Sequence, residues 1–220
     1  ESSSINQQGL KHLADLEQLT LTFAGKLQGE FLDLASSQLM DMADRAKSND
    51  QQWHLMQLAR DITARKTPLT DIFKKTLKQG FNDFRQGKLE HKIDRSYDMD
   101  SDLSLLANDE LEQNLAATSL ARKAETRMAE TLYSLNQRLA VINGGKKLID
   151  ETNPVGAYLF ATALQSVITE LKLDTRLSIL FFRIFEKLIL EHMPDFYLSL
   201  NNILIKAGIL PNLRYGKAQN

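Results

Sequence analysis

The chain has 220 residues, of which 43% are hydrophobic and 25% charged, and its formal net charge at pH 7 is −1. This length and apolar content allow a substantial core, in one domain or in two closely packed domains. The near-neutral charge argues against general nucleic-acid binding, which needs a basic face, and the absence of cysteine excludes disulfides, thiol nucleophiles and thiolate metal sites.

The first part of the chain shows three helical patterns. Apolar residues recur every three or four positions from about Leu10 to Lys47, which predicts one long helix. Gly25 and Gly29 lie on one face of it, where they indicate either a close helix crossing or a break, because glycine weakens a helix. A second helix is predicted from Trp53 to Lys66. A third starts at Thr67 and Pro68, and its apolar face carries Phe73, Leu77, Phe81 and Phe84.

After the third helix, the charge of the sequence changes from basic to acidic and the helical periodicity is lost. Residues 60–88 contain eight basic and three acidic residues, whereas Asp94 to Glu112 is acidic. We interpret both blocks as solvated surface, with mutual attraction or separate partners as the alternatives. Residues 87–108 lack a helical pattern, so we predict an acidic linker or hinge between an N-terminal helical part, 1–86, and a C-terminal helical bundle, 109–220.

A long helix is predicted after the linker. Asp109 and Glu112 match a capping box, which marks the beginning of a helix. Apolar residues then continue at helical spacing to Ile142, and Asn143 followed by Gly144 ends the pattern. At 1.5 Å per residue, such a helix approaches about 50 Å in length.

The last third of the chain is the most apolar and carries three helix starts. Asn153 with Pro154 predicts one start and Asp174 a second, while Pro194 closes the second helix or opens another. The helix after Asp174 has apolar residues on more than one side, so we expect it at the centre of the core. Gly208 predicts a left-handed cap at the end of the last helix.

These patterns together predict an all-α fold, a multi-helix bundle of roughly seven helices with no sheet, because no segment alternates with period two. The longest uncharged run, Thr152 to Thr169, is too polar for a membrane span, so we expect no membrane insertion. The absence of cysteine fits a reducing compartment, so we expect a cytoplasmic location. Because the chain begins at Glu1 rather than methionine, we expect a fragment of a longer protein.

Possible metal ligands do not form a recognisable site. Asp98, Asp100, Asp102 and Asp109 imitate a calcium loop, but Leu103 stands where that loop needs glycine. The histidines lie far apart in sequence and match no zinc motif; they are His12, His54, His91 and His192. We therefore predict no metal ligands.

Catalytic and cofactor motifs are also missing from the sequence. There is no nucleophile elbow, and the run from Gly144 to Lys147 lacks the spacing of a phosphate-binding loop, so we interpret it as a helix cap with solvated lysines. Trp53 and Tyr197 are interpreted as core or interface residues, with ligand stacking as the alternative. We predict no catalytic residue, no cofactor-binding residue and no cofactor.

Five blocks of sequence lie in order over most of the chain: ADRAKSNDQQ (43–52), NDELEQNLA (108–116), LNQRLAVI (135–142), NPVG (153–156) and YLSLNNILIKAGILPNL (197–213). Together they resemble a large bacterial family catalogued as domain of unknown function 1631. The resemblance implies a longer cytoplasmic protein, connected with cyclic-di-nucleotide signalling through a PilZ-like region further along. The RxxxR and DxSxxG motifs of such a region are absent from this chain.

The resemblance assigns no functional residue. Some family members carry a thymidine phosphorylase label, which this sequence does not support, because it has no phosphate-binding glycine loop and no α/β pattern. Within the matching blocks, Asn201 and Asn202 are expected to bond backbone groups between helices.

Two functions fit the sequence. The first is a non-catalytic helical interaction or regulatory module of a larger bacterial cytoplasmic protein. Its partners would be other domains of the parent protein, another protein or a second copy in a homodimer. The alternative is a small-ligand receptor or enzyme with its site in a cleft between helices.

Overall fold

The computed structural model describes residues 7–89, 105–149 and 152–213, and for residues 105–110 it describes the backbone alone. Helices account for nearly all of these residues. Within these ranges there are seven α-helices and no strand, which confirms the predicted all-α bundle. The helices are α1 (Gln7–Asp44), α2 (Asn49–Ala64), α3 (Lys66–Arg85), α4 (Leu105–Arg127), α5 (Ala129–Ile142), α6 (Ala157–Leu171) and α7 (Thr175–Lys206).

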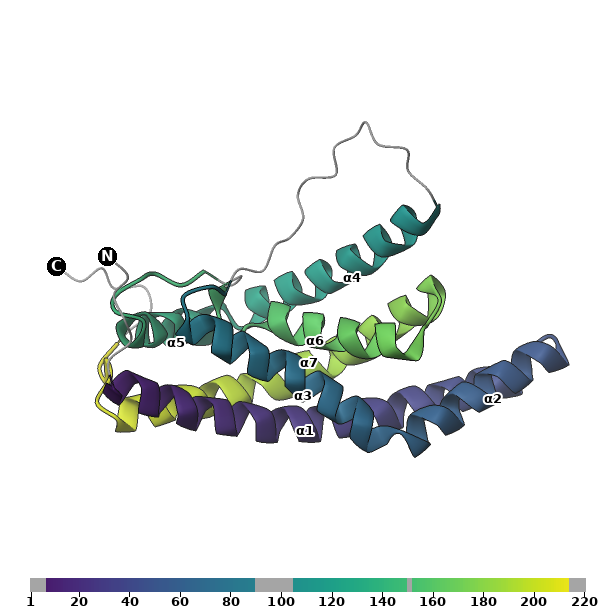
Figure 1. The fold of residues 1–220 in the computed structure, drawn as a ribbon, viewed down its shortest axis with the longest axis horizontal. Coiled ribbons are helices and arrows are strands. Elements are labelled where there is room, and N and C mark those ends of the chain that lie inside the picture. Colours follow the sequence, from purple (N-terminus) through teal and green to yellow (C-terminus); the bar gives the residue numbers. More distant parts are fainter. Residues whose placement is uncertain (1–6, 90–104, 150–151, 214–220) are drawn as a thin grey trace.

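Helix α7 is the centre of the bundle, as its apolar pattern predicts. It packs against α1, α4, α5 and α6 (Figure 1). Its aromatic residues reach the core from several directions, and Phe31 of α1 makes edge-to-face contacts with Phe181 and Phe185 at centroid distances of 5.5 and 5.4 Å. Such pairs add about 0.5–1.5 kcal/mol to the stability gained by burial.

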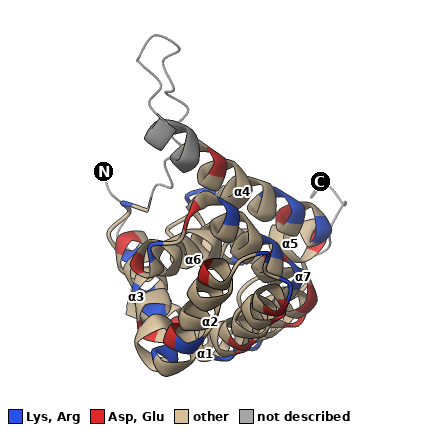
Figure 2. Cartoon of the chain, turned by 90° about the vertical axis from the view of Figure 1, so that its right-hand side faces the viewer, with Lys and Arg blue, Asp and Glu red and all other residues tan. Residues whose placement is uncertain are grey.

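The remaining helices surround this centre. Helix α3 packs against α1 on one side and α6 on the other, while α4 covers α6 and α7. Helix α2 packs mainly against the end of α1, and the two extend beyond the rest of the bundle (Figure 1). Seen end-on, the basic and acidic residues are interspersed over the helices (Figure 2). No helix of the described ranges is long and apolar enough to cross a membrane.

The first helix runs unbroken through both glycines, so the predicted alternative of a break is wrong. A Cβ atom at Gly25 would lie 2.9 Å from Cε of Lys74, and one at Gly29 would lie 3.6 Å from Cε of Lys66. The aliphatic stems of these α3 lysines therefore pass over the glycine face of α1. Nζ of Lys66 also lies 2.7 Å from both carboxylate oxygens of Asp33, which ties the two helices together.

The single long helix predicted from Asp109 to Ile142 is wrong. The helix begins at Leu105, so Asp109 is not its N-cap, and it is divided at Met128, where φ is −111° and ψ is 19°. Backbone hydrogen bonds continue on both sides of Met128, which is buried. The division lets α4 pack on α6 and α7, while α5 packs on α7 and α1.

The predicted helix boundary at Pro194 is also wrong, because α7 continues through this residue. A proline in a helix interior removes one donor and crowds the preceding turn, at a cost of about 3 kcal/mol. The neighbours Met193, Phe196 and Tyr197 are buried, so the packing of this segment offsets the cost. The number of helices still agrees with the prediction. The helix predicted from Asp109 to Ile142 is divided into α4 and α5, whereas the two helices predicted on either side of Pro194 form the single helix α7.

Asn153 and Pro154 lie before the helix that they were expected to start. Helix α6 begins at Ala157, and Oδ1 of Asn153 accepts a hydrogen bond of 2.9 Å from N of Val155, forming a turn instead. Two other end signals are confirmed. Oδ1 of Asp174 accepts from N of Leu177 at 2.8 Å, and Gly208 has the left-handed φ of 78°.

The buried residues of all seven helices form one core cluster. This cluster joins helices from both parts of the predicted division at residues 87–108, and that division stays a prediction. Residues 90–104, which include Asp98, Asp100, Asp102 and His91, lie outside the described residues.

Candidate functional site

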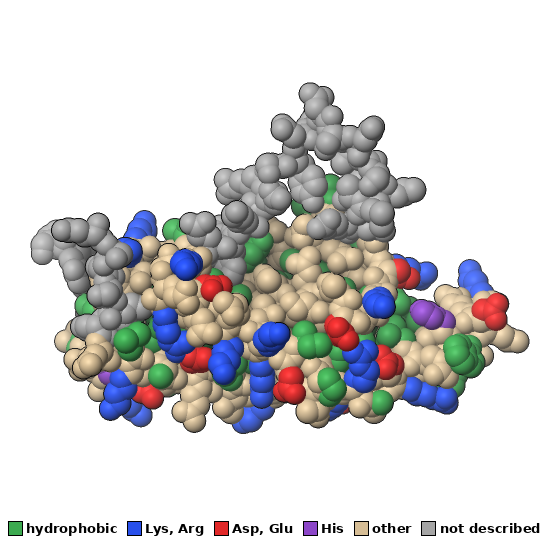
Figure 3. Space-filling view, in the orientation of Figure 1, with side chains coloured by type: hydrophobic (Ala, Val, Ile, Leu, Met, Phe, Trp, Pro, Cys, Tyr) green, Lys and Arg blue, Asp and Glu red, His purple; other side chains and the backbone are tan. Residues whose placement is uncertain are grey.

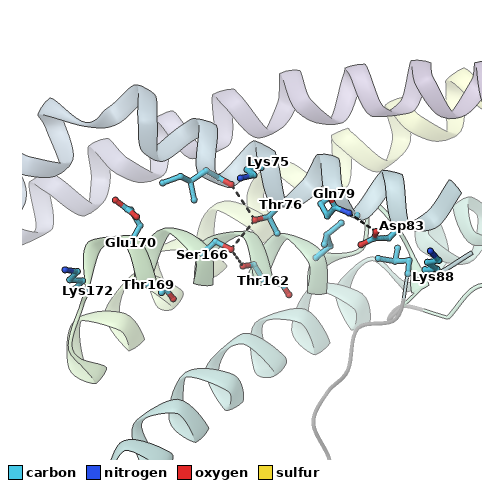
Figure 4. Close-up of a pocket in the computed structure, with 14 residues that line it drawn as sticks. Lys75, Thr76, Gln79, Asp83, Lys88, Thr162, Ser166, Thr169, Glu170 and Lys172 are labelled. Carbon is cyan, nitrogen blue, oxygen red and sulfur yellow. Dashed lines mark hydrogen bonds between the residues drawn. The ribbon is translucent and has the colours of Figure 1, made fainter. Parts of the chain in front are cut away.

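A groove follows the outer side of the seam between α3 and α6 (Figure 4). The two helices are antiparallel, because Arg65 pairs with Glu170 at one end and Gly80 meets Leu159 towards the other. The groove has a volume of about 860 Å³. The α3 residues that line the groove run from Ile72 to Asp83, and at 1.5 Å per residue this part of the groove is about 16 Å long.

Hydroxyl groups form the middle of the groove. Oγ1 of Thr76 and Oγ of Ser166 lie 3.1 Å apart across the seam, and Thr162 and Thr169 line the α6 side. The hydroxyls of Ser166 and Thr169 also donate to carbonyls one turn earlier in α6. Helical Ser and Thr commonly make this internal bond. Each oxygen keeps acceptor capacity towards a ligand.

Gly80 sets how closely α3 approaches α6. It is buried, and a Cβ atom at this position would lie 2.4 Å from Cδ2 of Leu159, which is itself buried. A separation below 3.0 Å between such atoms forces the neighbour to move. The floor of the groove therefore depends on the absence of a side chain at position 80.

We expect Gly80→Ala to lower the free energy of unfolding by about 1 kcal/mol, because overpacking of about 1–3 kcal/mol exceeds the helix-propensity gain of about 1 kcal/mol. Gly29→Ala is the matched control, since its nearest neighbour would be 3.6 Å away. That variant should be more stable than the parent by up to about 1 kcal/mol. Urea unfolding followed by circular dichroism measures the free energy of unfolding of both variants. Equal changes in the two variants would contradict the close approach at Gly80.

Three lysines at the groove have no ion-pair partner within the described ranges: Lys75, Lys88 and Lys172. The groove's two carboxylates are already engaged. Glu170 pairs with Arg65, and Oδ1 of Asp83 accepts from Nε2 of Gln79 at 2.8 Å. The Gln79 amide is neutral, so Asp83 keeps its negative charge. The groove charges outside ion pairs are therefore three lysines and one carboxylate, with a positive net charge.

The lysines are distributed along the groove rather than gathered at one point. Lys172 lies at one end beside Glu170, Lys88 lies at the other beside Asp83, and Lys75 stands on the α3 side (Figure 4). Lys172 is the C-cap of α6 and has a left-handed φ of 53°. This conformation costs a non-glycine residue about 1–2 kcal/mol. Its positive charge is favourable near the negative end of the helix dipole.

The basic run in residues 60–88 is thus only partly solvated surface. Arg65 pairs with Asp61 and Glu170, Lys66 with Asp33, and Arg85 with Glu17. Lysine and arginine side chains spread along the face that carries α3 (Figure 3). The sequence shows the basic excess, but which lysines stay unpaired depends on the packing of α6 and α1 against α3.

The other residues considered from sequence do not converge on this groove. Among the described residues, no group of three or more His, Asp or Glu side chains could hold a metal ion. Gly145 forms the cap predicted for it, with φ 83° and a 2.8 Å bond from its N to O of Ala140. Tyr197 is buried and donates to O of Val155 at 2.9 Å, whereas Trp53 is 65% exposed on α2.

A buried polar group, here named the Arg138 cluster, joins α5, α7 and the turn after α7. Arg138, only 3% exposed, donates to Oδ1 of Asn201 at 2.6 Å, to O of Ile209 at 3.2 Å and to O of Leu210 at 3.0 Å. Burial of the guanidinium lowers the pKa of Arg138 from its usual value. No described carboxylate lies within ion-pair distance of it.

Asn201 completes the cluster. Its Nδ2 donates to O of Thr131 at 3.1 Å and to O of Tyr197 at 3.2 Å, which confirms its expected role between helices. The neighbouring Asn202 is exposed. Sequence reasoning missed Arg138, because nothing in its local pattern distinguishes it from a solvated helix residue. The cluster is structural, since its hydrogen bonds hold backbone groups of the chain itself.

Comparison with known proteins identifies a family. The family model described as Protein of unknown function (DUF1631) N-terminal domain matches residues 10–208. No curated protein and no solved structure matches the chain. The matched range includes α1 from Leu10 onward, α2 to α7, and all residues of the α3–α6 groove.

Proposed function

We propose that this chain, which belongs to the DUF1631 family, is a non-catalytic interaction or regulatory module of a larger bacterial cytoplasmic protein. The matching family model is described as an N-terminal domain, which supports a place within a larger protein. The proposed binding surface is the α3–α6 groove, and its occupant is an acidic segment of another domain or of a partner protein. The observation that carries the proposal is the line of unpaired lysines along the groove.

The spacing of these lysines favours an elongated occupant. The part of the groove lined by α3 is about 16 Å long, with Lys88 and Lys172 at opposite ends. A single phosphate or carboxylate reaches only one end of such a site. An extended peptide covers about 3.3 Å per residue, so five or more residues with several carboxylates match the lysines. The hydroxyls of Thr76 and Ser166 lie between them and can bond peptide groups.

A fluorescein-labelled peptide of ten glutamates is the probe that tests this function. We expect it to bind the parent chain at low ionic strength, with binding measured by fluorescence anisotropy. The triple variant Lys75→Glu, Lys88→Glu, Lys172→Glu should bind roughly threefold to hundredfold more weakly, since three exposed ion pairs contribute roughly 0.2–1 kcal/mol each. Added salt should weaken binding to the parent.

The matched control moves the same charge elsewhere. Lys146, Lys147 and Lys206 are exposed and lie outside the groove. Their triple replacement by glutamate changes the net charge equally. If this control loses as much affinity as the groove variant, binding depends on overall charge, and the proposed surface is wrong.

The second candidate function is a small-ligand receptor in the same groove. The observation that favours it is the hydroxyl pair of Thr76 and Ser166 in a cavity of about 860 Å³ beside lysines, a combination that can hold phosphate groups. The proposed connection with cyclic-di-nucleotide signalling supplies the probe, cyclic diguanylate. A saturable rise in melting temperature that is lost in the groove variant would favour the receptor, and no rise would favour peptide binding.

A further inference from the structure

A second groove lies between α1 and α7, away from the α3–α6 seam. The two helices are antiparallel, since Phe23 stacks on Phe196 and Glu30 meets His192. The Phe23 and Phe196 rings are 4.1 Å apart and nearly parallel, at 5°. The groove has a volume of about 390 Å³, and its apolar floor is formed by Leu19, Phe23, Leu27 and Phe196.

A further apolar residue lies on the same face of α1. Leu34 follows Leu27 by seven residues, which places both on one helix face, and Leu34 is 45% exposed. The groove is apolar at its centre. Polar residues flank it on both helices: Thr22, Lys26 and Glu30 on α1, and His192, Asp195 and Ser199 on α7. An apolar centre with a polar rim is the usual anatomy of a protein interface.

The rim carries both signs of charge. Lys26 and Asp195 are exposed and have no ion-pair partner among the described residues. Oε2 of Glu30 lies 3.0 Å from Nε2 of His192, although the geometry is not that of a hydrogen bond. Glu30 and Asp195 would repel a uniformly acidic partner, and Lys26 would repel a uniformly basic one. The rim is instead complementary to a surface with the same mixture of charges.

We propose that the α1–α7 groove is the interface of a two-fold symmetric dimer, in which α1 packs antiparallel to α1 of a second copy. Lys26 and Glu30 are one turn apart, about 6 Å along the helix axis. With the two-fold axis between them, Lys26 faces Glu30 of the partner subunit, and the reciprocal contact follows by symmetry. The interface uses α1 and α7, so it does not rest on peptide binding at the α3–α6 groove.

Charge reversal tests this arrangement. Light scattering with size-exclusion chromatography should show the 220-residue chain as a concentration-dependent dimer. Lys26→Glu alone creates two like-charge contacts between subunits, and so does Glu30→Lys alone. Each variant should dimerise at least about tenfold more weakly than the parent, as expected for repulsion between closely placed charges. Both positions are exposed, so folding, checked by circular dichroism, should be retained.

Mixing the two variants provides the decisive result. A heterodimer of Lys26→Glu with Glu30→Lys regains two opposite-charge contacts, so the mixture should dimerise better than either variant alone. The double variant Lys26→Glu, Glu30→Lys should also recover the dimer. A parent chain that stays monomeric at high concentration would overturn the proposal. So would a dimer that neither substitution weakens, or one that mixing does not restore.

Discussion

Arg138→Ala is expected to lower the free energy of unfolding by about 3–5 kcal/mol. The substitution leaves three acceptors without their donor: Oδ1 of Asn201 and the carbonyls of Ile209 and Leu210. O of Leu210 keeps a 3.4 Å bond from N of Leu213, so the main losses are at Asn201 and Ile209. An acceptor that is buried without a partner costs about 1–3 kcal/mol, and the loss of the side chain adds a cavity. Leu210 also has a left-handed φ of 43°, so the cluster holds a turn that is unfavourable for leucine.

The buried charge of Arg138 is compatible with stability because of its surroundings. Carbonyl oxygens carry partial negative charge, and the turn after α7 directs those of Ile209 and Leu210 at the guanidinium. Arg138→Lys keeps the charge but not the fork of donors, so it should lie between the parent and the alanine variant.

Asn202→Ala is the control for the Arg138 cluster, because this neighbour of Asn201 is exposed. It should change the free energy of unfolding by less than about 0.5 kcal/mol. Urea unfolding monitored by circular dichroism measures all three variants. A loss below about 1 kcal/mol for Arg138→Ala would show that water satisfies the freed acceptors and that the cluster is unimportant for stability.

Gln28→Met is expected to raise the free energy of unfolding by about 1–3 kcal/mol. Gln28 on α1 is 0% exposed, and neither its Oε1 nor its Nε2 has a hydrogen-bond partner in the described part of the chain. Removing a buried amide from water without replacement bonds is unfavourable. Methionine has a similar length and flexibility, so it fills the same space without the polar atoms.

Gln38→Met provides the comparison for Gln28, since Gln38 lies on the same helix and is exposed. It should leave the unfolding free energy nearly unchanged. Thermal and urea unfolding measure the stability of both variants relative to the parent chain. If Gln28→Met is destabilising, the amide has hydrogen bonds that methionine removes, and the buried polar group is a stabilising part of the core.

Local chemistry predicts some helix ends in this chain and misses others. Asp174 and Gly208 act through hydrogen bonds and dihedral angles of a few neighbouring residues, so their roles are visible in sequence. The division at Met128 is not visible, because methionine favours helices and the hydrogen bonds continue on both sides. Pro194 predicts a helix boundary that the structure does not have, since burial of its neighbours outweighs the local preference to end the helix.

The candidate site was even less predictable. Sequence shows that residues 60–88 are basic, but Lys66 and Lys75 look alike there. Only the folded chain distinguishes them, because Lys66 reaches Asp33 of α1 while Lys75 lines the groove beside α6. The approach of α6 through Gly80 and Leu159 joins residues about eighty positions apart. No periodicity within either segment contains that information.

Peptide binding at the α3–α6 groove is tested most directly by mapping. Amide chemical shifts of the labelled chain should be followed during titration with the ten-glutamate peptide. The largest changes are expected at residues 72–89 and 159–172, with saturation, and they should disappear in the Lys75→Glu, Lys88→Glu, Lys172→Glu variant. Changes centred instead on Lys146 and Lys147 or on the α1–α7 groove, or no changes at all, would contradict the proposed site.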